Sequence, residues 1–312
     1  MISAPGIYDL SSDIYHADPA ETPSLSAGMI NDLLIAPAKC FEKSRRLNPN
    51  WEEEEKADRF TIGTVSHIMF LEPHLFEQKV AVLEFDDYRK AEAKKQRDDA
   101  RAAGKTPILW DQMDKVRKAR AAFLAHGFAR HAFTGGKTEQ SLFWRHPIYG
   151  FWCRARPDFI ADSRAHMCDY KATGNADPAR FGKHADDLGY HRRAAWYLEG
   201  AEIVFGRRPD HYWFVNQETK PPYLVSVVEL DRQALEAAQD ENDHAASIFA
   251  KCLETGDWYG YRHPDARDRD RAFQVGLPPY AYMKIDERLG RGPTPRQQAH
   301  AQQWADEEEE VA

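Results

Sequence analysis

The sequence lacks long apolar runs, and its cysteines are few and scattered. The longest apolar stretches, such as Ile68–Leu71, are far shorter than the about 20 residues of a membrane-spanning helix, so we expect none. Residues 1–6 carry neither the basic nor the apolar segment of a secretion signal, which predicts a cytoplasmic location. The four cysteines include no C-x-x-C pair, which argues against a zinc ribbon, a disulfide framework and an iron–sulfur cluster.

Motifs of several enzyme classes are also missing. The sequence contains no H-E-x-x-H and no G-x-S-x-G, so nothing supports a zincin protease or an α/β-hydrolase. Gly136-Lys137-Thr138 is similar to the end of a P-loop, but His131 stands where the earlier glycine is required. ATP use is therefore not supported.

Basic residues are not in excess over acidic ones. The 312 residues carry a net charge of −8, of which five negative charges lie in the run Asp306–Glu310 and three remain for the rest. Affinity for nucleic acid comes mainly from neutralising phosphates with lysine and arginine. A nucleic-acid surface on this chain must therefore be a local basic channel.

The order of the predicted elements indicates an α/β fold. Residues 1–135 are mainly helical, with helices expected at 27–34 (capped by Ser26), about 60–71 and 111–125. The charged segment 88–103 is either an exposed helix or a mobile excursion. The later elements are expected to be strands 140–146, 151–160 and 166–171, helices from Pro178 and from Gly189 to about 204, strands 211–217 and 223–230, and a helix from Asp231 to about 253. This order predicts a mixed central sheet flanked by helices, with a helical N-terminal elaboration.

We expect one domain over residues 1–278, with its catalytic core at 136–256. Residues 279–312 are polar, end in an acidic run and lack periodicity, and we expect a flexible acidic tail there.

Two strand ends combine acidic and basic residues in a pattern suited to metal-assisted hydrolysis. Asp158 follows Arg154-Ala155-Arg156-Pro157, and Asp169-Tyr170-Lys171 ends the next strand. Residues two apart on a strand share a face, so Asp169 and Lys171 are presented together while Tyr170 points away. Two carboxylates can hold Mg²⁺, and the lysine can orient or deprotonate a metal-bound water. The alternative is that both aspartates are turn or edge residues and Lys171 is their solvated partner.

Five blocks of residues, which include this pattern, follow one another along the chain. They are Gly63–His67 with Leu71–Pro73, Glu139 with Phe143-Trp144, Arg154–Phe159, Asp169–Lys171, and Gly189–His191 with Tyr197. In this order the blocks resemble the RecE-type exonuclease branch of the PD-(D/E)xK nuclease superfamily, whose core is shared with lambda exonuclease. Residues 15–34 and 277–279 are similar to the ends of the family, so the resemblance covers most of the chain.

The resemblance implies a restriction-endonuclease-like core and a role for each matching residue. Asp158, Asp169 and the Tyr170 carbonyl would bind Mg²⁺, with Mn²⁺ as a substitute, and Lys171 would serve the attacking water. His67 would be a further ligand or would hydrogen-bond that water; by itself it would be taken as a core or surface histidine. Glu139 would help to hold the cation, and its alternative is an exposed glutamate at a strand end.

Several residues are candidates for contacts with DNA. Arg154 and Arg156 share the predicted strand face of Asp158, where they grip phosphates or form ordinary salt bridges with Asp162 or nearby acids. The family commonly has a glutamine at the position of Arg193, which would be expected to touch DNA or the metal-bound water. Arg193 is either another phosphate contact, a competitor of the cation or a solvated residue. By resemblance Tyr197 also belongs to the DNA-binding set.

The sequence therefore predicts a Mg²⁺-dependent exodeoxyribonuclease acting on double-stranded DNA ends. From the resemblance we further expect 5′-to-3′ polarity, a role in phage-type homologous recombination, a strand-annealing recombinase as partner and a ring-like homo-oligomer. The alternatives are a non-catalytic DNA-end-binding recombination factor that keeps the fold, and a nuclease that prefers structured or single-stranded nucleic acid.

Overall fold

The computed structural model describes residues 1–52, 61–261 and 272–291 of the chain. The chain forms two compact units that divide after Tyr261, whereas one domain was expected over residues 1–278. The predicted flexible tail begins with helix α12 (Pro279–Arg288), which no periodic pattern had indicated; residues 292–312 lie outside the described chain. Within the described residues no helix combines the length and apolar character needed to cross a membrane.

A five-stranded mixed sheet forms the centre of the unit Met1–Tyr261. Its strand order is β11-β10-β9-β8-β5, with β9 parallel to β10 and the other neighbours antiparallel. The strands are β5 (Gly136–Thr138), β8 (Phe159–Ala161), β9 (His166–Thr173), β10 (His211–Glu218) and β11 (Val225–Val228). The predicted mixed α/β architecture is confirmed.

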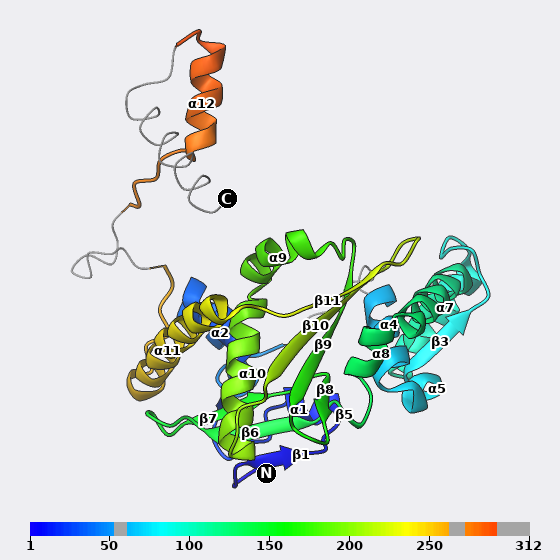
Figure 1. Ribbon diagram of the computed structural model, residues 1–312, viewed down its shortest axis with the longest axis horizontal. Helices are drawn as coiled ribbons and strands as arrows, with labels where there is room; N and C mark the ends of the chain where they lie inside the picture. Colours follow the sequence, from blue (N-terminus) through cyan, green and yellow to red (C-terminus); the bar gives the residue numbers. More distant parts are fainter. Residues whose placement is uncertain (53–60, 262–271, 292–312) are drawn as a thin grey trace. The chain divides into compact units, whose positions relative to one another are not determined.

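Helices cover both faces of this sheet (Figure 1). On one face, α10 (Tyr190–Phe205) packs with α11 (Arg232–Thr255) and α2 (Ala27–Ile35) into the largest apolar core. On the other, α4 (Thr61–Leu71), α7 (Trp110–Ala125) and α8 (Gly127–Ala132) pack on β9, β10 and β11. The sheet is therefore buried on both sides.

A second sheet of four strands has the order β1-β6-β7-β2. Its strands are β1 (Gly6–Tyr8), β2 (Ser24–Ser26), β6 (Ser141–Arg145) and β7 (Trp152–Ala155). Helix α10 packs on β6, where a Cβ at Gly200 would lie 2.5 Å from the ring of Trp144, so the contact needs a glycine. The short strands β1 and β2 fall in the part that was predicted to be helical.

The single strand predicted over 151–160 was wrong. The structure has β7 in one sheet and β8 in the other, with Arg156, Pro157 and Asp158 between them. Proline has no N–H to donate to a ladder and restricts the residue before it, so the chain changes sheets here. As a result Arg154 and Asp158 do not share one strand face.

Local signals set the ends of several elements. Asp231 caps α11, as predicted, by accepting a hydrogen bond from the Ala234 N–H at 2.7 Å. Gly189 joins α9 (Phe181–Leu188) to α10 at φ +67°, and a Cβ there would lie 2.3 Å from Asn31 Oδ1. Most of the charged segment 88–103 forms a helix, α6 (Ala91–Ala102).

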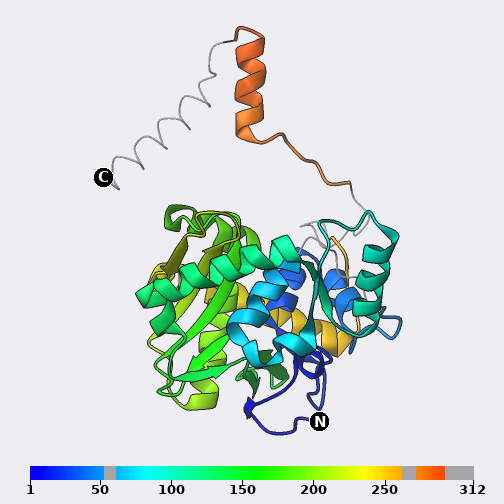
Figure 2. The same cartoon turned by 90° about the vertical axis from the view of Figure 1, so that its right-hand side faces the viewer.

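The remaining elements lie mainly at the periphery of this unit, and Figure 2 shows several of them from the side of α7. They are α1 (Ser12–His16), α3 (Pro37–Lys43), η2 (Pro73–Leu75), α5 (Phe76–Lys79), β3 (Val80–Leu83), α6 (Ala91–Ala102), β4 (Thr106–Leu109), η3 (Pro178–Arg180) and α9 (Phe181–Leu188). Strands β3 and β4 form a parallel pair of their own.

Candidate active site

Strands β8 and β9 bring the predicted acidic residues together. They pair antiparallel with Phe159 opposite Cys168, so the same register places Asp158 opposite Asp169. Asp158 is held from its neighbour strand, since its Oδ2 accepts the Tyr170 N–H at 2.6 Å. The two aspartates that the sequence assigned to one site therefore lie opposite each other, Asp158 just before β8 and Asp169 within β9.

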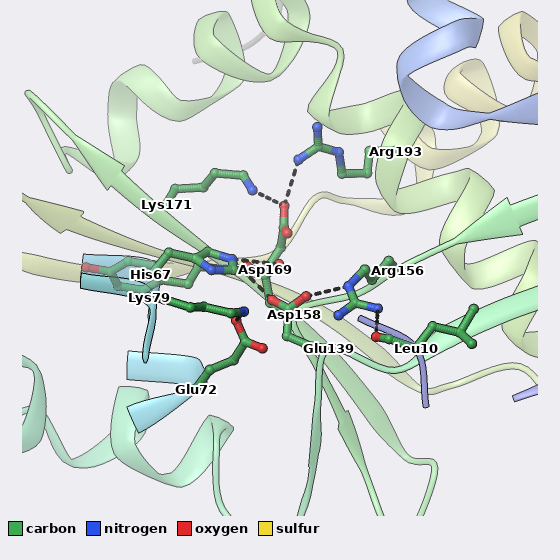
Figure 3. A network of polar contacts seen from close by, with 11 residues as sticks. Leu10, His67, Glu72, Lys79, Glu139, Arg156, Asp158, Asp169, Lys171 and Arg193 are labelled. Atoms are coloured by element: carbon green, nitrogen blue, oxygen red, sulfur yellow. Dashed lines mark hydrogen bonds and ion pairs between the residues drawn. The ribbon is translucent and has the colours of Figure 1, made fainter. Parts of the chain in front are cut away.

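Three side chains converge beside Asp158 in a group that could hold a metal ion. His67 from α4, Glu139 from the β5–β6 connection and Asp158 offer ligand atoms that all lie within 4.8 Å of one another. His67 Nε2 is 3.3 Å from Asp158 Oδ1 and 3.4 Å from Glu139 Oε1 (Figure 3). We refer to these three residues as the acidic triad. It contains the histidine and the glutamate that the sequence assigned by resemblance.

The backbone at Glu139 is held in an uncommon conformation. Its φ is +57°, in the left-handed region that non-glycine residues seldom adopt. The Glu139 N–H donates to the Asp158 carbonyl at 3.1 Å, and this bond ties the two acidic residues together. Such conformations persist where the surrounding structure enforces them, and they concentrate at functional sites.

The charges in the acidic triad are not balanced. Burial and the charge of Asp158 raise the pKa of Glu139 above its ordinary value. Burial alone would raise the pKa of Asp158, but its interaction with His67, Lys171 and the Tyr170 N–H holds it below its usual range. Burial opposes protonation of His67, but the two carboxylates outweigh it, and the pKa of His67 is raised. Two close, buried carboxylates therefore favour a cation or a proton between them.

The donor set fits a divalent cation. Glu139 Oε1 is buried and has no hydrogen-bond partner within the described residues, although it faces His67 Nε2. Buried polar atoms are almost always paired, so an orphaned carboxylate oxygen needs an explanation. Carboxylate oxygens suit Mg²⁺ and Mn²⁺, and one imidazole nitrogen is compatible with Mn²⁺.

Asp169 is turned away from the acidic triad. Its Oδ2 pairs with Lys171 Nζ and with Arg193 Nη1, the latter at 3.3 Å, and its side chain is only 3% exposed. Figure 3 shows the carboxylate between these two cations. Asp169 and Lys171 share a face as the strand alternation predicts, but the structure does not bring Asp169 into the metal-ligating group.

Tyr170 lies on the opposite face of β9. Its ring stacks on Phe70 at 4.6 Å and meets Phe123 edge-on at 6.2 Å, in the apolar layer beneath α4 and α7. This confirms that Tyr170 points away from its two neighbours. The role of its carbonyl as a metal ligand stays a prediction.

The two arginines before Asp158 are held by internal acids. Arg156 Nε contacts Glu139 Oε2 at 2.5 Å, and its Nη1 donates to the Leu10 carbonyl. Arg154 is buried and pairs with Asp18 at 2.9 Å, away from the acidic triad. Both arginines therefore form salt bridges, as in the alternative, but their partners are Asp18 and Glu139 rather than Asp162. The positive charge of Arg156 offsets part of the negative charge of the acidic triad.

Two aromatic residues of α10 lie near Arg193. Tyr197 is 8% exposed and meets Tyr212 edge-on, so little of it is available to a bound DNA. Tyr190 was part of the resembling motif but was not assigned a role. Its ring lies 5.3 Å from Lys171 Nζ and 5.6 Å from the Arg193 guanidinium carbon. The sequence does not indicate that both cations lie near Tyr190, because Lys171 belongs to β9 and Arg193 to α10.

A known structure shares this architecture, and two others are similar over parts of the chain. The "Putative exonuclease" of Eubacterium rectale matches with a TM-score of 0.56 at 13% identity over 89% of this chain and 98% of its own. A phage-related exonuclease of Haemophilus somnus 129PT has a TM-score of 0.34 at 9% identity over 76% and 97%. An alkaline exonuclease of Laribacter hongkongensis has 0.26 at 15% identity over 54% and 85%. The similarity to the Eubacterium rectale structure supports the fold.

In sequence, the chain matches a protein family but no individual curated protein. A search of curated proteins gives no significant match. The model of a protein family, by contrast, matches residues 26–262, which is most of the chain. This confirms the predicted PD-(D/E)xK resemblance: the chain belongs to the family described as PDDEXK-like domain of unknown function (DUF3799).

Proposed function

We propose that the protein is a divalent-metal-dependent exodeoxyribonuclease that hydrolyses phosphodiester bonds at double-stranded DNA ends. The acidic triad carries this proposal, because its three ligand atoms lie within 4.8 Å of one another and the charge of Lys171, on the next strand, acts on Asp158. The family membership supports a nuclease core. The name of the Eubacterium rectale structure, which has the same fold, agrees with exonuclease activity.

Each residue of the site has a proposed role in metal binding or in activating the attacking water. Asp158, Glu139 and His67 would hold Mg²⁺ or Mn²⁺, and Arg156 would restrain Glu139 through its 2.5 Å contact. When bound, such an ion lowers the pKa of a water and neutralises charge on the phosphate. Lys171, as a charged donor paired with Asp169, would orient the attacking water.

The expected direction and setting rest on the family resemblance. We propose 5′-to-3′ digestion in phage-type homologous recombination, with a strand-annealing recombinase as partner and a ring-like homo-oligomer. Duplexes labelled at the 5′ or the 3′ end, compared with single strands, determine the polarity and substrate. Size-exclusion chromatography with light scattering determines the number of subunits.

Release of nucleotides tests the activity itself. Purified protein with Mg²⁺ is expected to digest linear duplex DNA, and Lys171→Ala should slow it at least about a hundredfold, the loss typical when one oriented hydrogen-bond donor is removed from an active site. Lys183→Ala is the matched control, since this lysine is exposed on α9 and pairs with Asp187. Equal rates for the wild-type protein and Lys171→Ala would refute the enzymatic proposal.

A second candidate function is a non-catalytic DNA-end-binding factor. The Arg193–Asp169 ion pair favours it, because a fixed positive charge occupies a carboxylate that the predicted metal site uses. Binding of duplex ends that is unaffected by chelators, with no nucleotide release in Mg²⁺ or Mn²⁺, would support this function and exclude the first.

A further inference from the structure

Asp169 is fully compensated without a metal ion. The carboxylate is almost completely buried, and its Oδ2 receives both Lys171 Nζ and Arg193 Nη1. Two positive charges therefore face one negative charge. A divalent cation that approached this carboxylate would meet both of them, and like charges at such distances repel strongly in a partly buried site.

The acidic triad differs in this respect. Glu139 Oε1 is buried without a hydrogen-bond partner in the described residues, and Asp158 Oδ1 faces only the imidazole of His67 among the ion-pair contacts. These donors are available to a cation at once. Asp169 becomes available only if its two cationic partners, or one of them, move.

Arg193 is the partner that is able to move. It makes one contact with Asp169, at 3.3 Å, rather than the paired bonds of a strong arginine–carboxylate interaction. Its side chain is 30% exposed, compared with 16% for Lys171. Lys171 is also tied to Asp169 on the same strand face, whereas Arg193 reaches it from another element, α10.

The two cations also form a receptor for an anion. Both lie over the ring of Tyr190, at 5.3 Å for Lys171 and 5.6 Å for Arg193, so an incoming phosphate would meet them side by side. Guanidinium binds phosphate through several N–H groups, and one contact with Asp169 leaves others to donate.

We propose that Arg193 is a positioning residue that keeps Asp169 from the divalent cation until a DNA phosphate draws its guanidinium away. This rests on the proposed function. DNA and metal then bind cooperatively, because each favours the same separation of Arg193 from Asp169. By linkage, the factor by which DNA tightens metal binding equals the factor by which metal tightens DNA binding.

The test measures Mn²⁺ binding rather than activity. The EPR signal of free Mn²⁺ gives the dissociation constant of the full chain, alone and with a short duplex whose terminal linkages are hydrolysis-resistant phosphorothioates. Mn²⁺ bound by the duplex alone is subtracted. We expect the duplex to tighten Mn²⁺ binding about tenfold, within the usual range of coupling between sites. A duplex with uncharged methylphosphonates at those linkages should not do so.

Substitution of Arg193 identifies its part in the coupling. Arg193→Gln should bind Mn²⁺ about tenfold more tightly without DNA and show almost no further gain with it. Arg193→Lys retains the charge and should keep most of the coupling. Arg192→Gln is the matched control, because the neighbouring Arg192 pairs with Glu241 and Asn31 instead. Its coupling should equal that of the wild-type protein.

Two results of the Mn²⁺ titrations would overturn the proposed role of Arg193. If Arg193→Gln tightens Mn²⁺ binding equally with and without DNA, the guanidinium acts only as a fixed charge and the proposal is wrong. Unchanged coupling in Arg193→Gln overturns it as well. Failure of the exonuclease proposal is recognised separately, because it appears as absent nucleotide release from unmodified duplex, whatever the Mn²⁺ titrations give.

Discussion

Replacement of Asp158 by asparagine separates metal binding from structural support. The amide oxygen still accepts the Tyr170 N–H, so the loss is the difference between a charged and a neutral hydrogen bond, about 1 kcal/mol. Removing the negative charge relieves repulsion with Glu139 but also removes the attraction of Asp158 to His67 and Lys171. Without metal, the free energy of unfolding should therefore fall by about 1–3 kcal/mol.

With bound metal, the stabilities of the wild-type protein and Asp158→Asn should differ more than without it. At a Mn²⁺ concentration of 100 times the dissociation constant, the wild-type protein gains about 2.7 kcal/mol. For a unit of this size that raises the unfolding midpoint by about 5–10 °C. Asp158→Asn, which lacks a charged ligand, should gain little at the same concentration.

The assay is thermal unfolding followed by circular dichroism, with and without Mn²⁺. Asp162→Asn is the matched control, since Asp162 is exposed in the turn that follows β8, and its response should equal that of the wild-type protein. If Mn²⁺ stabilised Asp158→Asn as much as the wild-type protein, the acidic triad would not be the metal site.

Three further predictions concern titration and packing. Because a proton on His67 competes with a cation and its pKa is raised, Mn²⁺ affinity should fall as the pH drops, beginning above the ordinary histidine value of about 6.5; titrations at several pH values measure it. Gly200→Ala should lower stability by about 1–3 kcal/mol in urea unfolding, since the new Cβ would lie 2.5 Å from the Trp144 ring. Arg154→Ala should lower it by about 3–5 kcal/mol, because buried Asp18 loses its partner.

Each of these has a control or a contradicting result. A Mn²⁺ affinity that is constant from pH 6 to pH 8 would place His67 outside the metal site. Gly182→Ala on α9 meets no atom within 4 Å and should leave stability nearly unchanged. Arg145→Ala removes an exposed ion pair with Glu21 and should cost at most about 1 kcal/mol. If Arg154→Ala instead reduced DNA affinity with full stability, its predicted role as a phosphate contact would be right.

Local patterns in the sequence were sufficient for much of the fold. The alternation along Asp169-Tyr170-Lys171 correctly separated the two faces of β9, and Asp231 correctly marked the start of α11. Both depend on residues that are neighbours in the chain. Pro157 is also a local signal, for a break in the strand, but the alternation of Arg154, Arg156 and Asp158 predicts one continuous strand where the structure has two strands in different sheets.

Contacts between distant segments were not predictable in the same way. The pairing of Arg193 with Asp169 depends on where α10 lies relative to β9, and the contact of Arg156 with Glu139 depends on the change of sheets after β7. Neither spacing nor periodicity contains this information. The short strands β1 and β2 were missed because three residues are too few for a recognisable alternation.

A crystal soaked in Mn²⁺ tests the central claim most directly. The anomalous signal should place one ion at about 2.1 Å from donors of His67, Glu139 and Asp158, the distance typical of hard divalent ions. Without DNA, Asp169 should remain paired with Arg193. An ion bound elsewhere, or no ion at saturating Mn²⁺, would contradict the assignment of this site as the metal centre of a nuclease.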